Sequence, residues 1–67
     1  MIYRIRCTDR QLDVPLHSAP YGDLESAKSG LKRWKNRASW HRLEIWESDP
    51  EQKKKPKCVY TEERNSG

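Results

Sequence analysis

Phenylalanine is absent from this sequence of 67 residues, and only 33% of the residues are hydrophobic. The three Trp and three Tyr residues must therefore supply much of the buried area of a single small core. No apolar run approaches the ~18 residues of a membrane-spanning helix, and no signal-peptide segment follows Met1. We therefore expect a cytoplasmic protein without membrane contact, whose two cysteines are reduced thiols.

Groups that carry chemistry are equally sparse. The sequence has no serine in a nucleophile elbow, no glycine-rich loop before a helix and no carboxylate pair in an obvious cleft. We expect neither an enzyme nor a cofactor; in an enzyme, His17 or His41 would be the general base. Cys7, His17, His41 and Cys58 are scattered singly and match no usual zinc spacing, so no metal site is expected.

Three stretches alternate between apolar and polar residues, as half-buried strands do: 2–8, 12–17 and 41–47. Residues 57–61 are predicted to form a short fourth strand at a sheet edge. In 12–17, Leu12, Val14 and Leu16 fall on one side, and Pro15 removes a hydrogen-bond donor. This strand should therefore lie at a sheet edge. Residues 48–56 read as a loop between prolines, and 62–67 have no apolar anchor.

One amphipathic helix is predicted over residues 24–37, with Asp23 as its N-cap. Its apolar stripe consists of Leu24, Ala27, Leu31, Trp34 and Ala38. Gly30 inside it costs ~1 kcal/mol relative to Ala, which indicates a close approach of the helix to the sheet. The sequence predicts an α+β fold of order ββαββ over residues 1–61, with a flexible tail at 62–67.

Most of the excess of basic over acidic residues lies on and just after the predicted helix. No Asp or Glu occurs from Ser26 through Leu43. Lys28, Lys32 and Lys35 form one stripe, and Arg33 and Arg37 form a neighbouring row. This surface is a candidate site for a nucleic-acid backbone or an acidic protein patch. A merely solvated helix face is the alternative.

The predicted outer face of the sheet is the second candidate, and it carries Arg4, Arg6, Arg42 and Trp46. An exposed tryptophan among arginines can stack on bases or act as a hot spot for a protein partner. Alternatively, the arginine stems cover Trp46 and no ligand binds there. The lysines at 53–55 are interpreted as a solvated loop, because Asp49 and Glu51 flank them.

The run GDLESAKSGLKRWK at 22–35, followed by RLEIWE at 42–47, resembles many short bacteriophage and prophage accessory proteins. In those proteins an N-capped amphipathic helix leads into a strand with a similar R-x-E-I-x pattern. The resemblance covers about half of the chain, and no functional residue is transferred from it. It implies a non-enzymatic protein that binds a host component or nucleic acid, in the host cytoplasm if the protein is phage-encoded.

These observations predict a small binding protein that docks on a polyanionic partner such as nucleic acid. The alternative is an inhibitor or adaptor of a host protein, with its hot spot at Trp46 and a contribution from Tyr60. A homodimer through the open sheet face is a third option. The helix row and the outer sheet face lie on opposite sides of a thin domain, so we do not expect them to serve one ligand together.

Overall fold

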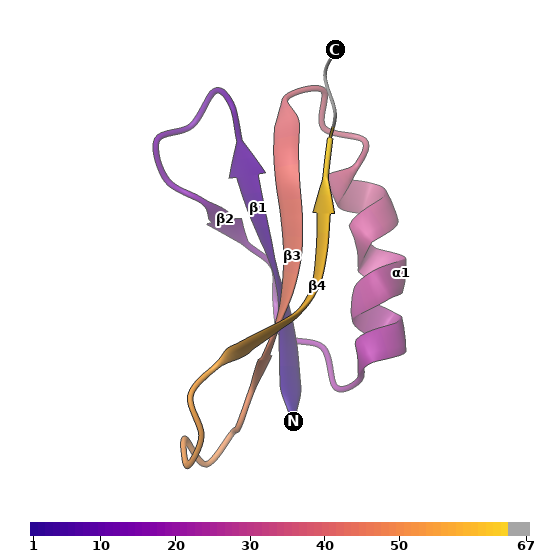
Figure 1. Ribbon diagram of the computed structural model, residues 1–67. Coiled ribbons are helices and arrows are strands. Elements are labelled where there is room, and N and C mark those ends of the chain that lie inside the picture. The colour runs from indigo at the N-terminus through magenta and orange to yellow at the C-terminus, as the bar shows by residue number, and fades with distance from the viewer. Residues whose placement is uncertain (65–67) are drawn as a thin grey trace.

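Five elements follow one another in the order strand, strand, helix, strand, strand (Figure 1). A computed structural model describes residues 1–64 and places β1 at Ile2–Asp9, β2 at Leu16–His17, α1 at Leu24–Trp34, β3 at Trp40–Ser48 and β4 at Lys57–Glu63. The strands form one antiparallel sheet in the order β2-β1-β3-β4, and α1 packs on one of its faces. The predicted α+β fold of order ββαββ is confirmed.

The core lies between α1 and the two central strands. Ile5 stands opposite Ile45 and Cys7 opposite Leu43, and all four side chains are fully buried. Ala27 and Leu31 of α1 close this layer. Because strand side chains alternate between faces, the residues between these core positions must face away from the helix.

The helix begins where the sequence predicts but ends earlier. Asp23 Oδ1 accepts a hydrogen bond of 2.7 Å from the Ser26 backbone N–H, which also lowers the pKa of the Asp23 carboxyl. The helix predicted over residues 24–37 ends at Trp34, within the few residues by which such boundaries vary. There the Arg37 N–H bonds to the Trp34 carbonyl in a tight turn, and the guanidinium of Arg37 is held by Asp9 at 3.1 Å. No helix within residues 1–64 has the length and apolar character needed to cross a membrane.

Gly30 marks a close contact, as predicted, and Tyr21 makes most of it. A Cβ at Gly30 would lie 2.3 Å from the hydroxyl oxygen of Tyr21 and 3.2 Å from Cδ1 of Ile5. The backbone of Tyr21 is fixed to β1 by two hydrogen bonds with Tyr3, of 2.9 and 2.7 Å. Any side chain at residue 30 would therefore require the ring of Tyr21 to move.

The second strand is much shorter than predicted. The sequence predicts 12–17, whereas only Leu16 and His17 pair with β1. Leu12 and Val14 are 43% and 66% exposed, so they do not line the core. Pro15 has no N–H to give to the ladder, and the chain instead turns at Asp9, whose carbonyl accepts from the Leu12 N–H at 3.2 Å.

The last strand extends past the predicted domain boundary at residue 61. Glu62 and Glu63 pair with β3 opposite Leu43 and Arg42, and the Arg64 N–H bonds to the His41 carbonyl at 2.9 Å. Backbone pairing therefore holds residues 62–64, which the sequence assigns to the tail for want of an apolar anchor. The rest of that predicted tail, 65–67, lies outside the described residues.

A bulge in β4 places the loop at 49–56. The register shifts between Ile45, which pairs with Tyr60, and Trp46, which pairs with Cys58. Val59 and Tyr60 both pack against the core as a result. Bulges increase the local twist, and in Figure 1 the lower half of the β3–β4 hairpin swings away from α1 and extends past the start of β1.

Candidate nucleic-acid interface

The outer face of the sheet brings together the four side chains that the alternation assigns to it. Arg4 stands opposite Trp46, Arg6 opposite Glu44, and Thr8 opposite Arg42. Their neighbours in the sequence form the core, so these residues lie on the face that α1 leaves uncovered.

Glu44 is the member of this face that sequence reasoning missed. It is only 8% exposed and lies between two arginines, 3.8 Å from Arg6 Nε and 3.7 Å from Arg42 Nη2. Arg42 has a second carboxylate, Glu63, at 3.6 Å. The alternation of residues 42–46 puts Glu44 in the phase of Arg42 and Trp46, but only the strand pairing shows that its carboxylate lies between Arg6 and Arg42. Two of the three outer arginines are thus neutralised within the chain, and Arg4 is the exception.

Trp46 is half-buried and offers its carbon surface to this face. Its Nε1 is enclosed and has no hydrogen-bond acceptor within residues 1–64. The ring lines a shallow concavity of about 230 Å³ together with Arg4, Arg6, His17, Ser48 and Pro56. The Nε atoms of Arg6 and Arg42 likewise find no hydrogen-bond acceptor among the described residues, so this face is short of acceptors.

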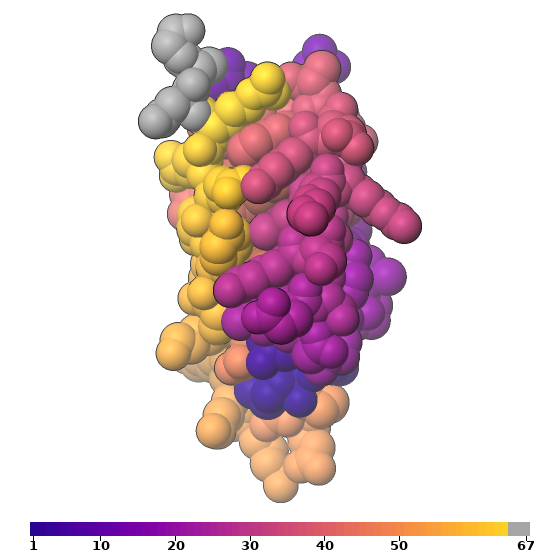
Figure 2. Space-filling view, turned by 90° about the vertical axis from the view of Figure 1, so that its right-hand side faces the viewer, coloured from indigo at the N-terminus to yellow at the C-terminus, as the bar shows by residue number. Residues whose placement is uncertain are grey.

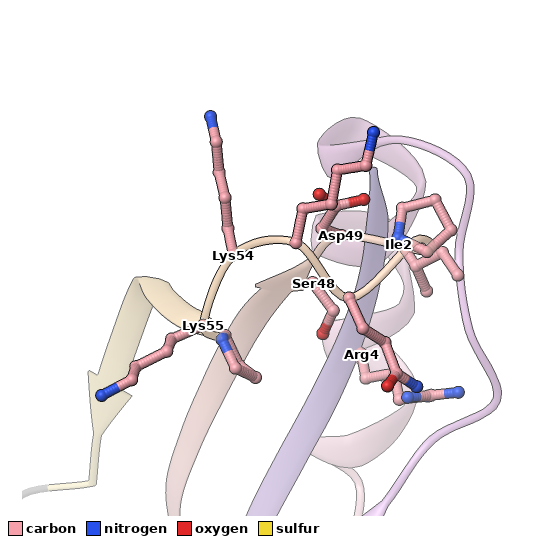
Figure 3. A pocket seen from close by; sticks show the side chains of 10 residues that line it. Ile2, Arg4, Ser48, Asp49, Lys54 and Lys55 are labelled. Atoms are coloured by element: carbon pink, nitrogen blue, oxygen red, sulfur yellow. The ribbon is translucent and has the colours of Figure 1, made fainter.

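A larger concavity of about 590 Å³ adjoins the first, between the start of β1 and the loop at 49–56. Ile2, Arg4 and Ser48 form its floor and the loop forms its wall (Figure 3). Within the loop, Asp49 accepts from the Glu51 N–H at 2.9 Å and its carbonyl accepts from the Gln52 N–H at 2.9 Å. The loop is therefore built on a hydrogen-bonded turn at its start, and Gln52 follows with φ of 59°.

The acids beside the lysines have partners of their own. Asp49 is engaged by the turn, and Glu51 pairs with Lys53 at 2.9 Å. Lys54 and Lys55 make no ion pair in the described part of the chain, and Figure 3 shows both side chains extending outward from the loop. The interpretation of the lysines at 53–55 as a solvated loop stays a prediction, and Lys54 and Lys55 are the two of them without an acidic partner among the described residues.

The two concavities form an adjoining pair, because both are lined by Arg4, Ser48 and Pro56. We call this the outer groove. Trp46 lines its smaller part, Lys54 and Lys55 line its larger part, and Arg4 lines both. These three cations have no acidic partner among residues 1–64.

Comparisons with protein-family models, with curated proteins and with solved structures found no match. What the outer groove and the helix surface can bind must therefore be argued from their own geometry.

The helix row predicted as an anion-binding surface is partly neutralised. β4 runs alongside α1 in Figure 2, and its Glu62 lies 2.6 Å from Lys35 Nζ, which raises the pKa of Lys35. Lys28 Nζ lies over the ring of Tyr60, 5.6 Å from its centroid. Lys32 and Arg33 make no ion pair within residues 1–64. The acid-free stretch of sequence could not reveal this, because Glu62 comes from a distant strand.

Tyr60 and Trp46 do not share a face. Tyr60 pairs with Ile45, packs against the core on the helix side and donates to Glu62 at 3.2 Å. A hot spot built from both rings is therefore excluded, and Trp46 would have to act without Tyr60.

The remaining reactive side chains are dispersed or enclosed. Cys7 is fully buried, and this burial raises the pKa of its thiol. Within residues 1–64, no three side chains of His, Cys, Asp or Glu gather as metal ligands would. His41 lies 3.4 Å from Arg10, whereas His17 is exposed at the outer groove. The outer groove is therefore the strongest candidate site.

Proposed function

We propose that this protein is a small, non-catalytic binding module whose outer groove docks on nucleic acid. One observation carries the proposal: Arg4 lines both the concavity of the half-buried Trp46 and the adjoining concavity of Lys54 and Lys55, and these three cations have no acidic partner in the described chain.

Each part of the groove suits a different part of the ligand. Lysine and arginine that contact phosphate release condensed counterions, which is the main source of sequence-independent affinity. The carbon surface of Trp46 can stack on a base, at ~1–3 kcal/mol per base. The net charge of +4 favours association with a polyanion.

The test is the salt dependence of binding to a fluorescein-labelled 16-nucleotide oligo(dT), measured by anisotropy from 50 to 300 mM NaCl. The double variant Lys54→Gln/Lys55→Gln should bind more weakly. Its slope of log K against log salt should be shallower by about 0.7 for each phosphate that the variant no longer neutralises. Lys28→Gln is the matched control, because Lys28 lies over Tyr60 on the other face. Wild-type protein that fails to bind at 50 mM salt, or a double variant with an unchanged slope, would refute the proposal.

An inhibitor or adaptor that contacts a protein through Trp46 is the second candidate. The enclosed Nε1 and the exposed carbon surface of Trp46 favour an apolar contact, with Arg6 and Arg42 nearby. A partner captured through Trp46 should be lost with Trp46→Ala and be retained after nuclease treatment. Its affinity should change little between low and physiological salt. The phage or prophage origin, the cytoplasmic location and a homodimer through the open face stay predictions; sedimentation at micromolar concentration tests the last.

A further inference from the structure

A third concavity, of about 460 Å³, lies beyond the β2 edge of the sheet, between the chain after β2 and the helix. Tyr21, Arg33, Trp34 and Arg37 contribute to its walls. His17 lines both this concavity and the outer groove. Because β2 is an edge strand of only two residues, the outer groove and this third concavity meet at His17 on the edge of the sheet.

The charge along this path is strongly one-sided. The concavity beside the loop is lined by Arg4 and the lysines at 53–55. Arg6 is added in the concavity at Trp46, and the concavity beside the helix is lined by Arg33 and Arg37. These are seven of the 14 Lys and Arg residues of the chain, whereas Asp49 is the one lining residue among its ten acids. Three of the seven have internal partners, since Arg6 pairs with Glu44, Arg37 with Asp9 and Lys53 with Glu51.

The four cations without an ion pair in residues 1–64 are spread along the path: Lys54, Lys55 and Arg4 toward one end and Arg33 at the other. Half-buried tryptophans lie on both sides of the edge, Trp46 on the outer face and Trp34 beside the helix. Alternating cations and aromatic surfaces along a groove are the arrangement that proteins use to track a single strand, with its bases stacked and its phosphates paired.

We propose that this path, which we call the edge path, binds single-stranded nucleic acid that turns round the β2 edge and reaches Arg33. The inference rests on the proposed function and specifies its ligand. A duplex has a persistence length of about 150 base pairs, whereas the longest dimension of the protein is 39 Å. A duplex therefore stays straight across the protein and meets one face, whereas a single strand can follow the turn.

The expectation that the helix row of Lys28, Lys32 and Lys35 does not serve one ligand together with the sheet face is unchanged, because Arg33 lies outside that row. The helix cations divide into two groups. Lys28 and Lys35 lie toward β4, with Tyr60 and Glu62, whereas Arg33 lines the concavity beside His17. Of these helix cations, Arg33 is the one that lies on the side of the outer groove.

The experiment combines ligand length with a matched pair of variants of the full chain. Arg33→Gln removes a cation from the edge path. Lys32→Gln removes the adjacent exposed cation, which lines none of the three concavities. Affinities are measured by anisotropy for oligo(dT) of 4 and 16 nucleotides, oligo(rU) of 16 nucleotides and a 16-base-pair duplex. Far-UV circular dichroism checks that both variants stay folded.

We expect Arg33→Gln to weaken the 16-nucleotide strands about 3- to 10-fold and to reduce the salt slope by about 0.7, while Lys32→Gln changes affinity less than 2-fold. The 4-nucleotide strand, too short to span the path, and the duplex should not distinguish the two variants. Comparing oligo(dT) with oligo(rU) shows which sugar is preferred.

Equal effects of Arg33→Gln and Lys32→Gln on the 16-nucleotide strands would overturn the edge path, and so would a duplex that loses as much affinity as a single strand on Arg33→Gln. The proposed function would survive either result if Lys54→Gln/Lys55→Gln still weakened binding. The absence of binding to every oligonucleotide at 50 mM salt would overturn both.

Discussion

Gly30→Ala isolates the contact that seats the helix on the sheet. The new Cβ would lie 2.3 Å from Oη and 2.9 Å from Cζ of Tyr21, and 3.2 Å from Ile5 Cδ1. Displacing the ring of Tyr21 has a cost, because this ring is half-buried and packs against the core.

Two opposing contributions set the change in the free energy of unfolding caused by Gly30→Ala. Replacing glycine by alanine inside a helix is worth about 1 kcal/mol in helix propensity. Forcing an extra carbon into a filled site costs about 1–3 kcal/mol. Because two atoms of one ring lie at or below 2.9 Å from the Cβ position, we expect the second term to win. The net loss should be about 1 kcal/mol, a sizeable part of the ~3–5 kcal/mol available to a domain of this size.

A double-mutant cycle with Tyr21→Val separates the two terms. Valine removes the ring but keeps a residue suited to the bridge with Tyr3. In that background Gly30→Ala should stabilise by up to about 1 kcal/mol, which gives a coupling of about 2 kcal/mol between the two sites. Unfolding in urea followed by circular dichroism measures all four proteins. Ser29→Ala, at an exposed helix position, is the control for propensity alone.

The reasoning would be refuted if Gly30→Ala stabilised both backgrounds equally, because the ring of Tyr21 would then not occupy the space in question.

Two further predictions concern the pH dependence of stability and the packing of individual side chains. Asp9 is 2% exposed, and hydrogen bonds from the Ser39 hydroxyl and the Gln11 N–H, together with Arg37, hold its pKa below the ordinary value. A lowered pKa stabilises the fold above the unfolded value of about 4, and this stabilisation is lost as the pH falls through the folded value. The stability difference between wild type and Asp9→Asn should therefore shrink as the pH falls below about 4, and a difference that stayed constant between pH 7 and 2 would contradict this. Val14→Ser should change the free energy of unfolding by less than about 0.5 kcal/mol because Val14 is 66% exposed, whereas Ile45→Ala should cost about 2–5 kcal/mol in the core. Urea titration compares the two, and a large loss for Val14→Ser would restore the long second strand that the alternation predicts.

The sequence by itself determined the features that depend on near neighbours. The two-residue period of 2–8 and 41–47 placed Ile5 and Ile45 in the core. It placed Arg4 and Trp46 on the outer face, because side chains alternate along any extended backbone. The N-cap at Asp23 and the tight approach at Gly30 were likewise predictable from residue type and position.

Only the tertiary structure decided which of these surfaces carry uncompensated charge and which of them join. Glu62 neutralises Lys35 across 27 positions of sequence, and Glu44 is shared by arginines of two strands, since ion pairs depend on strand order and register. The pairing of β2 stops after two residues, so His17 becomes the edge round which the outer groove and the helix concavity meet. Such non-local pairings depend on how the whole chain closes on itself, and local periodicity carries no information about them.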